Sequence, residues 1–460
     1  MKKNILWLAV ALLTAFAGVS CSNVDDLSEV PTPNPSKEVA ENIVTFTAML
    51  DAKGGSGMRA VSASGVTTWV ANEEILISYK NTSDISQEAK ATVKSVDANG
   101  KATITASLVS PMDESEVYFY YPYESWKSTS TIDFASGQDG SLSTLSQYFD
   151  YAVDDSFITH VPYTLSVSGG VATLPSSINM VNYYLIWKLS FTDGTNDITS
   201  DITKLEIHAS AGGTTDYTIT PTTPITDYFY VAMGDLSNDD IVITAHTSSG
   251  IYRRAKSNIT LEMGKIYTTT GLALTKVEVG KVIGADGNIY ADADAATTAG
   301  TSALAKVTYI GNDNCESAPY NHGLALALSD ANGGTACEWN MPATDAGHTK
   351  QASSTFTEES GLQYNDATHN SDTYPAFKAA ITYSPAAPTG CSSWFLASGY
   401  QWQKMISAAG LSNLGLSSDA VYWSSTEHSA NYAWWLYSND GSWSPNNKDY
   451  VYRVRACLAF

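Results

Sequence analysis

The residue types that catalyse reactions are present in this chain, but none stands at a catalytic spacing. No G-x-S-x-G, H-E-x-x-H or phosphate-binding loop motif occurs, so the usual marks of a serine nucleophile, a zinc protease or a nucleotide site are missing. His322, His348, His369 and His428 follow no metal-binding spacing, and we interpret them as loop or core residues. We therefore expect no catalytic residue, no metal, no cofactor and no enzyme.

Near its N-terminus the sequence carries signals for covalent processing, namely removal of a signal peptide and acylation. Residues 1–20 carry two lysines and then an apolar run, which predicts a secretory signal peptide. Cys21 follows Gly18-Val19-Ser20 and is a candidate for acylation, which anchors a protein to a membrane without spanning it. Residues 21–41 form an acidic, proline-rich linker, which we expect to be an extended spacer. Asp25, Asp26 and Glu29 follow Cys21, and this acidic run resembles the export signal of surface lipoproteins in the Bacteroidetes. The resemblance implies an outer-membrane, lipid-anchored protein at the cell surface; a periplasm-facing lipoprotein is the alternative.

Within the last forty residues, polar and aromatic side chains fill positions 428–452, between the segments YWSSTE (422–427) and RVRA (453–456). Tyrosine offers a large, rigid contact with a polar tip, and serine, asparagine and aspartate offer adaptable hydrogen bonds, as in antibody loops. We therefore predict a ligand-binding surface here. Its candidate residues are His428, Asn431, Tyr432, Trp435, Tyr437, Asn439, Asp440, Ser442, Ser444, Asn446, Asp449, Tyr450 and Tyr452.

The secondary structure predicted to support this surface differs between the first and the last part of the chain. Residues 42–275 contain short β-branched and aromatic runs separated by Gly, Asn, Asp and Ser, which predict strands such as Ile43–Leu50 and a pair of sandwiches, 42–160 and 161–275. Residues 276–460 mix strand-like runs with a helix expected over 399–409 and ending at Gly410. The predicted fold class is mostly β: two tandem β-sandwich domains and then an α+β domain. The net charge of −22 argues against a nucleic-acid partner.

Residues 42–275 resemble the fimbrillin family, the pilins and pilin-like lipoproteins of the Bacteroidetes. The resemblance rests on the first strand, the loop GGSGMRAV with Arg59, the segments WVANEEI (69–75) and YFYYPYESW (118–126), and the ending MGKIYTTTGLAL. It implies that a trypsin-like protease cuts after Arg59, that the first strand is lost, and that a strand from another fimbrillin subunit fills the groove. A bulky C-terminal domain leaves no strand to donate onward, so the resemblance implies a pilus-tip position.

Residues 276–460 resemble the C-type-lectin-like fold in the form shared with formylglycine-generating-enzyme-like domains. The matching segments are WFLASG (394–399), YWSSTE and the closing YRVRA. Within this fold the resemblance points to targets of diversity-generating retroelements, whose varied codons yield Tyr, Ser, Asp, Asn and His, so the surface is expected to be diversified. Trp435 does not derive from an asparagine codon. The enzyme branch of this fold uses a close cysteine pair, which is missing here.

Four further cysteines, Cys315, Cys337, Cys391 and Cys457, are expected to form disulfides in an oxidising compartment. Four cysteines allow three disulfide connectivities, and all three are open. A disulfide between Cys391 and Cys457, which one of them contains, would link the ends of the lectin-like half.

Two alternatives to a diversified adhesin stay open. The first is a stand-alone lipoprotein whose lectin-like site binds one fixed glycan. The second is a calcium-dependent sugar lectin, although Ser438-Asn439-Asp440 and Ser444-Pro445-Asn446 offer few acidic ligands for calcium. The partner is in each case a glycan or a protein on a host or bacterial surface.

Overall fold

The computed structural model describes residues 42–51, 69–121, 123, 136–142, 150–152, 162–182, 185–209, 215–262 and 265–460. The chain is mostly β, as its β-branched and aromatic runs predict. Cys21 and Arg59, the expected sites of lipidation and proteolysis, lie outside the described residues. Among the described residues, no helix has both the length and the apolar character needed to cross a membrane.

The first sheet contains strands β1–β9. Their bounds are β1 (Ile43–Leu50), β2 (Glu74–Lys80), β3 (Ser86–Val96), β4 (Ala102–Val109), β5 (Ser115–Tyr121), β6 (Asp150–Ala152), β7 (Tyr163–Ser168), β8 (Val171–Thr173) and β9 (Met180–Asn182). β2 pairs with both β3 and β5, so the strands β2-β3-β4-β1-β8-β7-β5 close on themselves. The predicted boundary between residues 160 and 161 falls inside this sheet, because β7, β8 and β9 pair within it.

Strand β1 was predicted over the same residues that form it. Val44, Phe46, Ala48 and Leu50 are buried and alternate with outward-facing side chains, which is the period of a half-buried strand. β1 runs antiparallel to β4 along its whole length and parallel to β8 on its other side. It is therefore an interior strand of the sheet.

Residues 185–276 form two sheets that share one apolar core. One sheet contains β10 (Leu185–Thr192), β13 (Phe229–Met233) and β16 (Ile266–Ala273), and the other β11 (Ile202–Ala209), β12 (Thr215–Ile219), β14 (Leu236–Thr247), β15 (Gly250–Leu261) and β17 (Thr275–Lys276). Leu189 from the first sheet and Ile207 and Ile243 from the second lie in the same core cluster. This is the packing of a β-sandwich.

The C-terminal part contains a six-stranded sheet with an apolar cluster on each face. Its strands, in spatial order, are β19 (Ile289–Tyr290), β18 (Val282–Gly284), β20 (Ala303–Ile310), β21 (Gly323–Ala327), β26 (Ala456–Ala459) and β22 (Phe395–Leu396). Helix α4 (Pro375–Ile381) contributes Phe377 to one cluster, and α5 (Gly399–Ala409) contributes Trp402 to the other. A short helix, α3 (Ala293–Thr298), contacts β18, β19 and β20.

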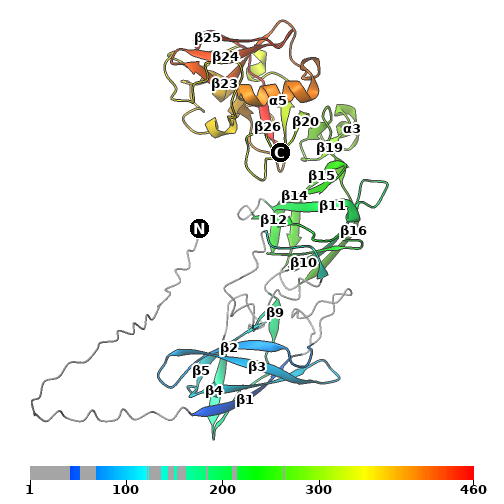
Figure 1. Ribbon diagram of the computed structural model, residues 1–460, viewed down its shortest axis with the longest axis vertical. Coiled ribbons are helices and arrows are strands. Elements are labelled where there is room, and N and C mark those ends of the chain that lie inside the picture. The colour runs from blue at the N-terminus through cyan, green and yellow to red at the C-terminus, as the bar shows by residue number, and fades with distance from the viewer. Residues whose placement is uncertain are drawn as a thin grey trace, which may run out of the picture. The chain divides into compact units, whose positions relative to one another are not determined.

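Helix α5 confirms the helix expected over 399–409. Its N-terminus is a capping box, in which Ser398 and Gln401 satisfy each other's backbone N–H groups. It ends at Gly410, whose φ of 79° lies in the left-handed region that glycine tolerates. Figure 1 shows α5 beside β20 and β26, with the remaining strands, β23 (Val421–Ser429), β24 (Tyr432–Tyr437) and β25 (Trp443–Asn447), forming a separate three-stranded sheet.

Candidate binding surface

The candidate surface is built on the antiparallel sheet β23-β24-β25. Tyr422 to Glu427 on β23 are all buried, and so are Val454 to Phe460 beyond the surface residues. None of the thirteen candidate ligand residues is buried: seven are exposed and six are partly exposed. The exposed ones are Asn431, Tyr432, Asn439, Asp440, Ser442, Asp449 and Tyr450. The two flanking segments thus form the interior, and the residues between them supply the surface.

The candidates do not form one patch, because neighbouring residues of a strand point to opposite faces. On one face, Trp435 of β24 pairs across the sheet with Ser444 of β25 and lies 5.7 Å, ring to ring, from Tyr452. Asn446 donates to the Tyr452 hydroxyl at 2.5 Å. The Tyr450 ring lies 6.4 Å from that of Tyr452. We call Trp435, Ser444, Asn446, Tyr450 and Tyr452 the aromatic patch.

Two candidates lie on the opposite face of the same ribbon. The ring of His428 is 6.3 Å from that of Tyr432 and 5.2 Å from that of the buried Trp434. Trp434 in turn meets the edge of Phe356 and donates its indole N–H to the Gln351 carbonyl at 2.5 Å. Tyr432 is 43% exposed, so this face also offers an aromatic contact.

Tyr437, Asn439, Asp440 and Ser442 lie at the β24–β25 turn, while the exposed Asn431 and Asp449 lie between β23 and β24 and after β25. Asn439 donates to the Asp419 carboxylate and accepts from the Asp419 backbone N–H at 2.9 Å, and the Tyr437 hydroxyl also donates to Asp419 at 3.2 Å. Asp440 accepts from the Ser442 backbone N–H at 2.8 Å. Hydrogen bonds from the Ser442 side chain and from its backbone N–H lower the pKa of Asp440. The turn is therefore polar, accessible and held in one conformation.

A buried acid ties the two flanking segments together. Asp330 accepts from Tyr422 of YWSSTE at 2.9 Å, from Arg453 at 2.8 Å and from Arg455 at 2.8 Å. Burial raises the pKa of Asp330, but the arginines and the tyrosine outweigh that effect and hold the pKa below its ordinary value. Sequence reasoning missed Asp330. The available signal was the pair of arginines two residues apart in a buried stretch, which requires an acid.

A second buried ion pair lies directly under the candidate surface. Lys448 and Glu427 pair with both side chains completely buried. The Lys448 ammonium also donates to the carbonyls of Thr344 at 2.7 Å and Ala430 at 2.8 Å, so its three N–H groups all have acceptors. Burial lowers the pKa of Lys448, and Glu427 opposes that shift. Lys448 stands among the candidate residues in sequence, yet it belongs to the interior.

Two of the four histidines weighed from the sequence are core residues, as expected. His348 and His369 are buried and their Nε2 atoms lie 2.9 Å apart. The His348 ring stacks on Tyr364 at 3.7 Å, and His369 Nδ1 lies 2.9 Å from an Asp366 carboxylate oxygen. Burial, aided by His369, lowers the pKa of His348 to about 4. This histidine is therefore neutral at physiological pH.

The expected disulfides are not formed: Cys315, Cys337, Cys391 and Cys457 are free thiols. Geometry explains the absence of the Cys391–Cys457 pair. The Cys457 side chain belongs to the apolar cluster on one face of the six-stranded sheet, and Cys391 belongs to the cluster on the other face. Burial of apolar groups, not a covalent staple, therefore holds this domain together.

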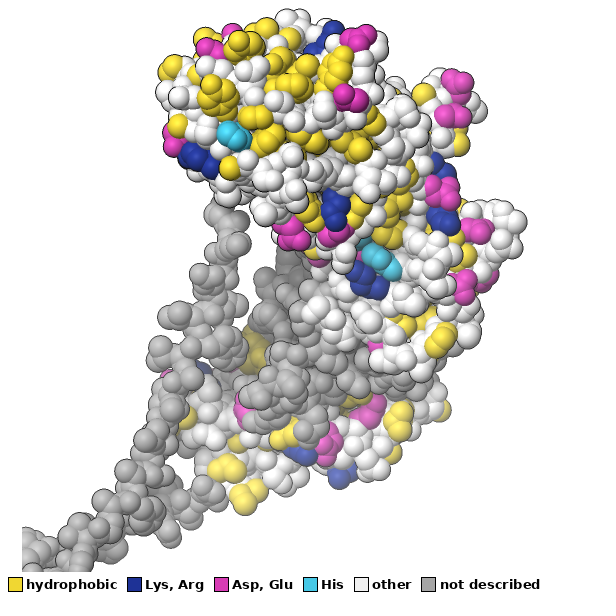
Figure 2. All heavy atoms as spheres, turned by 45° about the horizontal axis from the view of Figure 1, so that its top comes forward, with side chains coloured by type: hydrophobic (Ala, Val, Ile, Leu, Met, Phe, Trp, Pro, Cys, Tyr) yellow, Lys and Arg dark blue, Asp and Glu magenta, His cyan; other side chains and the backbone are white. Residues whose placement is uncertain are grey.

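Figure 2 shows hydrophobic side chains, a class that there includes tyrosine and tryptophan, on the face of the C-terminal part that is turned to the viewer, with charged groups mainly toward its edge. A contact surface rich in tyrosine and tryptophan and poor in charge is typical of protein and sugar binding.

No model of a protein family matches this sequence, and no curated protein sequence is detectably similar to it. Among solved structures, a fimbrial protein from Bacteroides ovatus ATCC 8483 aligns over 92% of this chain and 100% of its own, with 14% identity and a TM-score of 0.35. A proposed cell adhesion protein from Bacteroides fragilis NCTC 9343 aligns over 48% of this chain and 88% of its own, with 11% identity and a TM-score of 0.28. At these TM-scores the likeness does not establish a common fold.

Proposed function

We propose that this chain is a cell-surface adhesin whose C-terminal domain presents the β24–β25 ribbon and residues 449–452 to a glycan or protein ligand. One observation carries the proposal: every candidate residue is accessible, while the segments on either side of them are buried. A binding module needs this division, since contact residues must be presented on a rigid frame.

The aromatic patch is the best-formed candidate contact within this surface. Tyr450 is 54% exposed, and its ring lies beside that of Tyr452, which in turn lies beside that of Trp435. Aromatic rings stack on the apolar faces of sugars and also supply the anchor residues of protein interfaces. Asn446 and Ser444 beside them add hydrogen-bonding groups, which fix the orientation of a ligand.

We further propose that this surface is diversified. The side chains that would vary lie outside the interior, so changing them leaves intact the ion pairs of Asp330 and Lys448. The DNA beside the gene tests this point. A near-repeat of codons 421–460 that differs at adenines, with a reverse-transcriptase gene nearby, is expected. A genome without such a repeat would favour the alternative of a stand-alone lipoprotein with a fixed glycan site.

The N-terminal part supports a pilus-type assembly, in which Cys21 anchors the chain and cleavage at Arg59 releases β1. β1 fills an interior position between β4 and β8, so its removal exposes two strand edges and the apolar groove that Phe46 occupied. At the other end, β26 is paired on both sides, with β21 and β22. The C-terminal strand is thus engaged within its own domain, which fits a subunit that accepts a strand and donates none.

Strand acceptance has a direct test. A fluorescent peptide IVTFTAML, the sequence of β1, is added to the chain before and after digestion with a trypsin-like protease. The digested chain is expected to bind it and the intact chain is not. A peptide with serine at the Phe46 position is the control and is expected to bind at least tenfold more weakly. Equal binding to both forms of the chain would argue against assembly by strand addition.

The binding proposal is tested with the soluble chain from Ser22 onward, applied to a printed glycan array and to intact bacterial cells. The double variant Tyr450→Ala, Asn446→Ala removes the outer part of the aromatic patch, and Tyr432→Ala changes the opposite face. Tyr400→Ala on α5 is the matched control. We expect loss of binding in the double variant alone; loss in Tyr432→Ala alone would move the site to the other face. Failure of the unaltered chain to bind any glycan or cell would overturn the proposal.

A calcium-dependent lectin is separated from this proposal by the same array. Binding that requires added calcium and is abolished by a chelator would identify that alternative.

A further inference from the structure

The outward face of the five-stranded sheet carries an unusual set of polar residues. On β11, Leu205, Ile207 and Ala209 enter the sandwich core, so Glu206 and His208 point away from it. On β14 the same alternation turns His246 outward. In the register of these antiparallel strands Lys204 faces His246, which places Glu206 and His246 on one face as diagonal neighbours.

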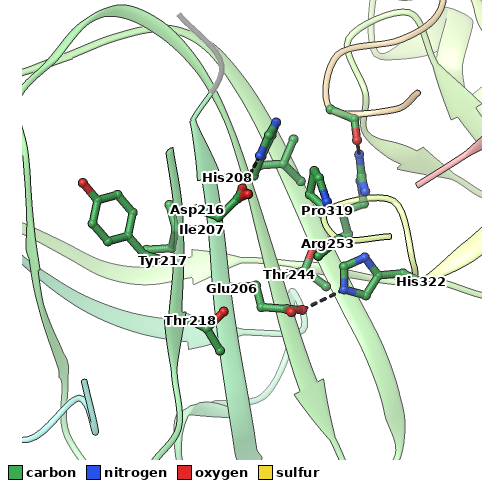
Figure 3. A pocket seen from close by; sticks show the side chains of 13 residues that line it. Glu206, Ile207, His208, Asp216, Tyr217, Thr218, Thr244, Arg253, Pro319 and His322 are labelled. Carbon is green, nitrogen blue, oxygen red and sulfur yellow. Dashed lines mark hydrogen bonds and ion pairs between the residues drawn. The ribbon is translucent and has the colours of Figure 1, made fainter. Parts of the chain in front are cut away.

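A third residue reaches this face from the loop before β21. His322 Nε2 lies 2.7 Å from the Glu206 Oε2 atom, and His246 Nε2 lies 2.5 Å from the same oxygen. The ligand atoms of the three residues all lie within 4.8 Å of one another. Figure 3 shows Glu206 and His322 pointing toward each other, Glu206 from β11 and His322 from the facing loop.

The surroundings fit an ion as well. The other carboxylate oxygen of Glu206 accepts from Lys204 at 2.9 Å, which fixes the carboxylate and leaves Oε2 to face the two imidazoles. His322 is buried and His246 is 23% exposed, so the cluster has a protected side and a route to solvent. Glu206 and His322 also line a pocket of about 40 Å³, more than the roughly 15 Å³ that one water requires.

The hydrogen bonds around Glu206 favour its ionised form. Burial raises the pKa of Glu206, but hydrogen bonds from His246, His322 and Lys204 outweigh burial and hold the pKa well below its ordinary range. A metal would bind this set through the carboxylate oxygen and an unprotonated nitrogen of each imidazole.

We propose that Glu206, His246 and His322 form a binding site for a divalent cation of the zinc type. Two imidazole nitrogens and one carboxylate oxygen suit zinc, and the pocket leaves room for water as a fourth ligand. Calcium is a poor fit, because it prefers six or more oxygen ligands. Lys204 is the outer group that orients the carboxylate, a role typical of residues around metal ligands.

This site would join parts of the chain that are far apart in sequence. Glu206 and His322 are separated by 116 positions, one on the sandwich sheet and the other on the loop that enters β21. An ion held by both would stabilise their contact through its binding free energy. The proposal does not depend on the binding surface, since none of its residues belongs to that surface.

The test is zinc binding to the chain from Ser22 onward, freed of metal with a chelator. Calorimetry with zinc chloride is expected to give one ion per chain, and cobalt is expected to give the visible absorption of a tetrahedral site. The variants His246→Gln and His322→Gln keep an N–H donor for Glu206 but remove a zinc ligand. Each is expected to weaken zinc binding at least tenfold, the lower bound seen even for changes in groups behind the ligands.

The matched control is His208→Gln. His208 lies on the same strand and lines the same pocket, but its Nδ1 pairs with Asp216 at 2.5 Å. We expect its zinc affinity to stay within twofold of the unaltered chain. Near-ultraviolet circular dichroism verifies that each variant is folded. The absence of zinc binding by the folded, unaltered chain, or equal binding by the His246 and His322 variants, would overturn the proposal.

Discussion

Arg455 directs two of its nitrogen atoms at a single oxygen of Asp330: Nε lies 2.8 Å and Nη2 2.7 Å from Oδ1. Both side chains are nearly buried, at 4% and 5% exposure. Arg455 also donates to the Ala327 carbonyl at 2.8 Å. The pair thus joins the end of β21 to the approach to β26, and it anchors the C-terminal side of the candidate surface.

Replacing this acid is expected to destabilise the chain strongly. Asp330→Asn keeps the shape but leaves the buried Arg455 without a counter-charge, which costs about 3–5 kcal/mol in comparable pairs. The control is Asp313→Asn, because Asp313 pairs with Lys404 at a site that is 46% exposed; there we expect a change below about 1 kcal/mol. Urea unfolding followed by tryptophan fluorescence measures both, and equal changes in the two variants would contradict the assigned role.

Lys448, Asp449 and Tyr450 are consecutive, but Lys448 is buried and the other two are exposed. Asp449→Ser and Tyr450→Asn alter exposed side chains, and the free energy of unfolding is expected to change by less than about 0.5 kcal/mol. Lys448→Ala removes the buried partner of Glu427 and leaves only Lys350, 3.7 Å from the other carboxylate oxygen; it is expected to cost about 3–5 kcal/mol. The same urea titration serves here. A large loss in Tyr450→Asn would mean that this tyrosine supports the fold and is not a free contact residue.

Acid is expected to weaken the fold through His348. Its pKa of about 4 lies below the unfolded value of 6.5, so between these pH values the unfolded chain binds a proton that the folded chain does not. Stability therefore falls as pH drops through this window, by up to about 1.4 kcal/mol per pH unit.

The variant His348→Gln carries no titrating ring, so its stability is expected to depend less steeply on pH between 6.5 and 4. His428→Gln, at an accessible position, is the control. Melting temperatures across this range measure the slopes. If His348→Gln and the unaltered chain had the same slope, another group would be responsible.

The absence of disulfides can be tested by counting the free thiols of the chain. In denaturant without reductant, the chain from Ser22 onward is expected to react with Ellman's reagent at four cysteines. In the native chain the reaction is expected to be slow, because burial raises the pKa of Cys337 to about 12 and raises those of Cys391 and Cys457 as well. A count of two or none in denaturant would mean that disulfides form after all.

Local features were predictable from sequence, and distant pairings were not. The bounds of β1 follow from its alternating pattern, and those of α5 from Ser398, Gln401 and Gly410. Asp330 and Arg455 are 125 positions apart, so no spacing rule connects them. The same reason hides Glu206 and His322, the latter of which we interpreted as a loop or core residue.

The candidate surface was predicted as a list of residues but not as a shape. All of its members are accessible, as a binding surface requires, yet the alternation of β24 places Tyr432 and Trp435 on opposite faces. The strand period alone would have separated them. Lys448 was beyond such reasoning, because only the fold brings Glu427, Thr344 and Ala430 around its ammonium group.

The place of β26 between β21 and β22 also sets an order of events during synthesis. The six-stranded sheet lacks an inner strand until residues 456–459 have been synthesised. A frameshift or premature stop anywhere in residues 421–452 removes both Arg455 and this strand. Such a product cannot complete the core of this sheet. Folding of this domain therefore requires an intact reading frame through the stretch that carries the candidate surface, while single-residue changes at its accessible positions leave the core in place.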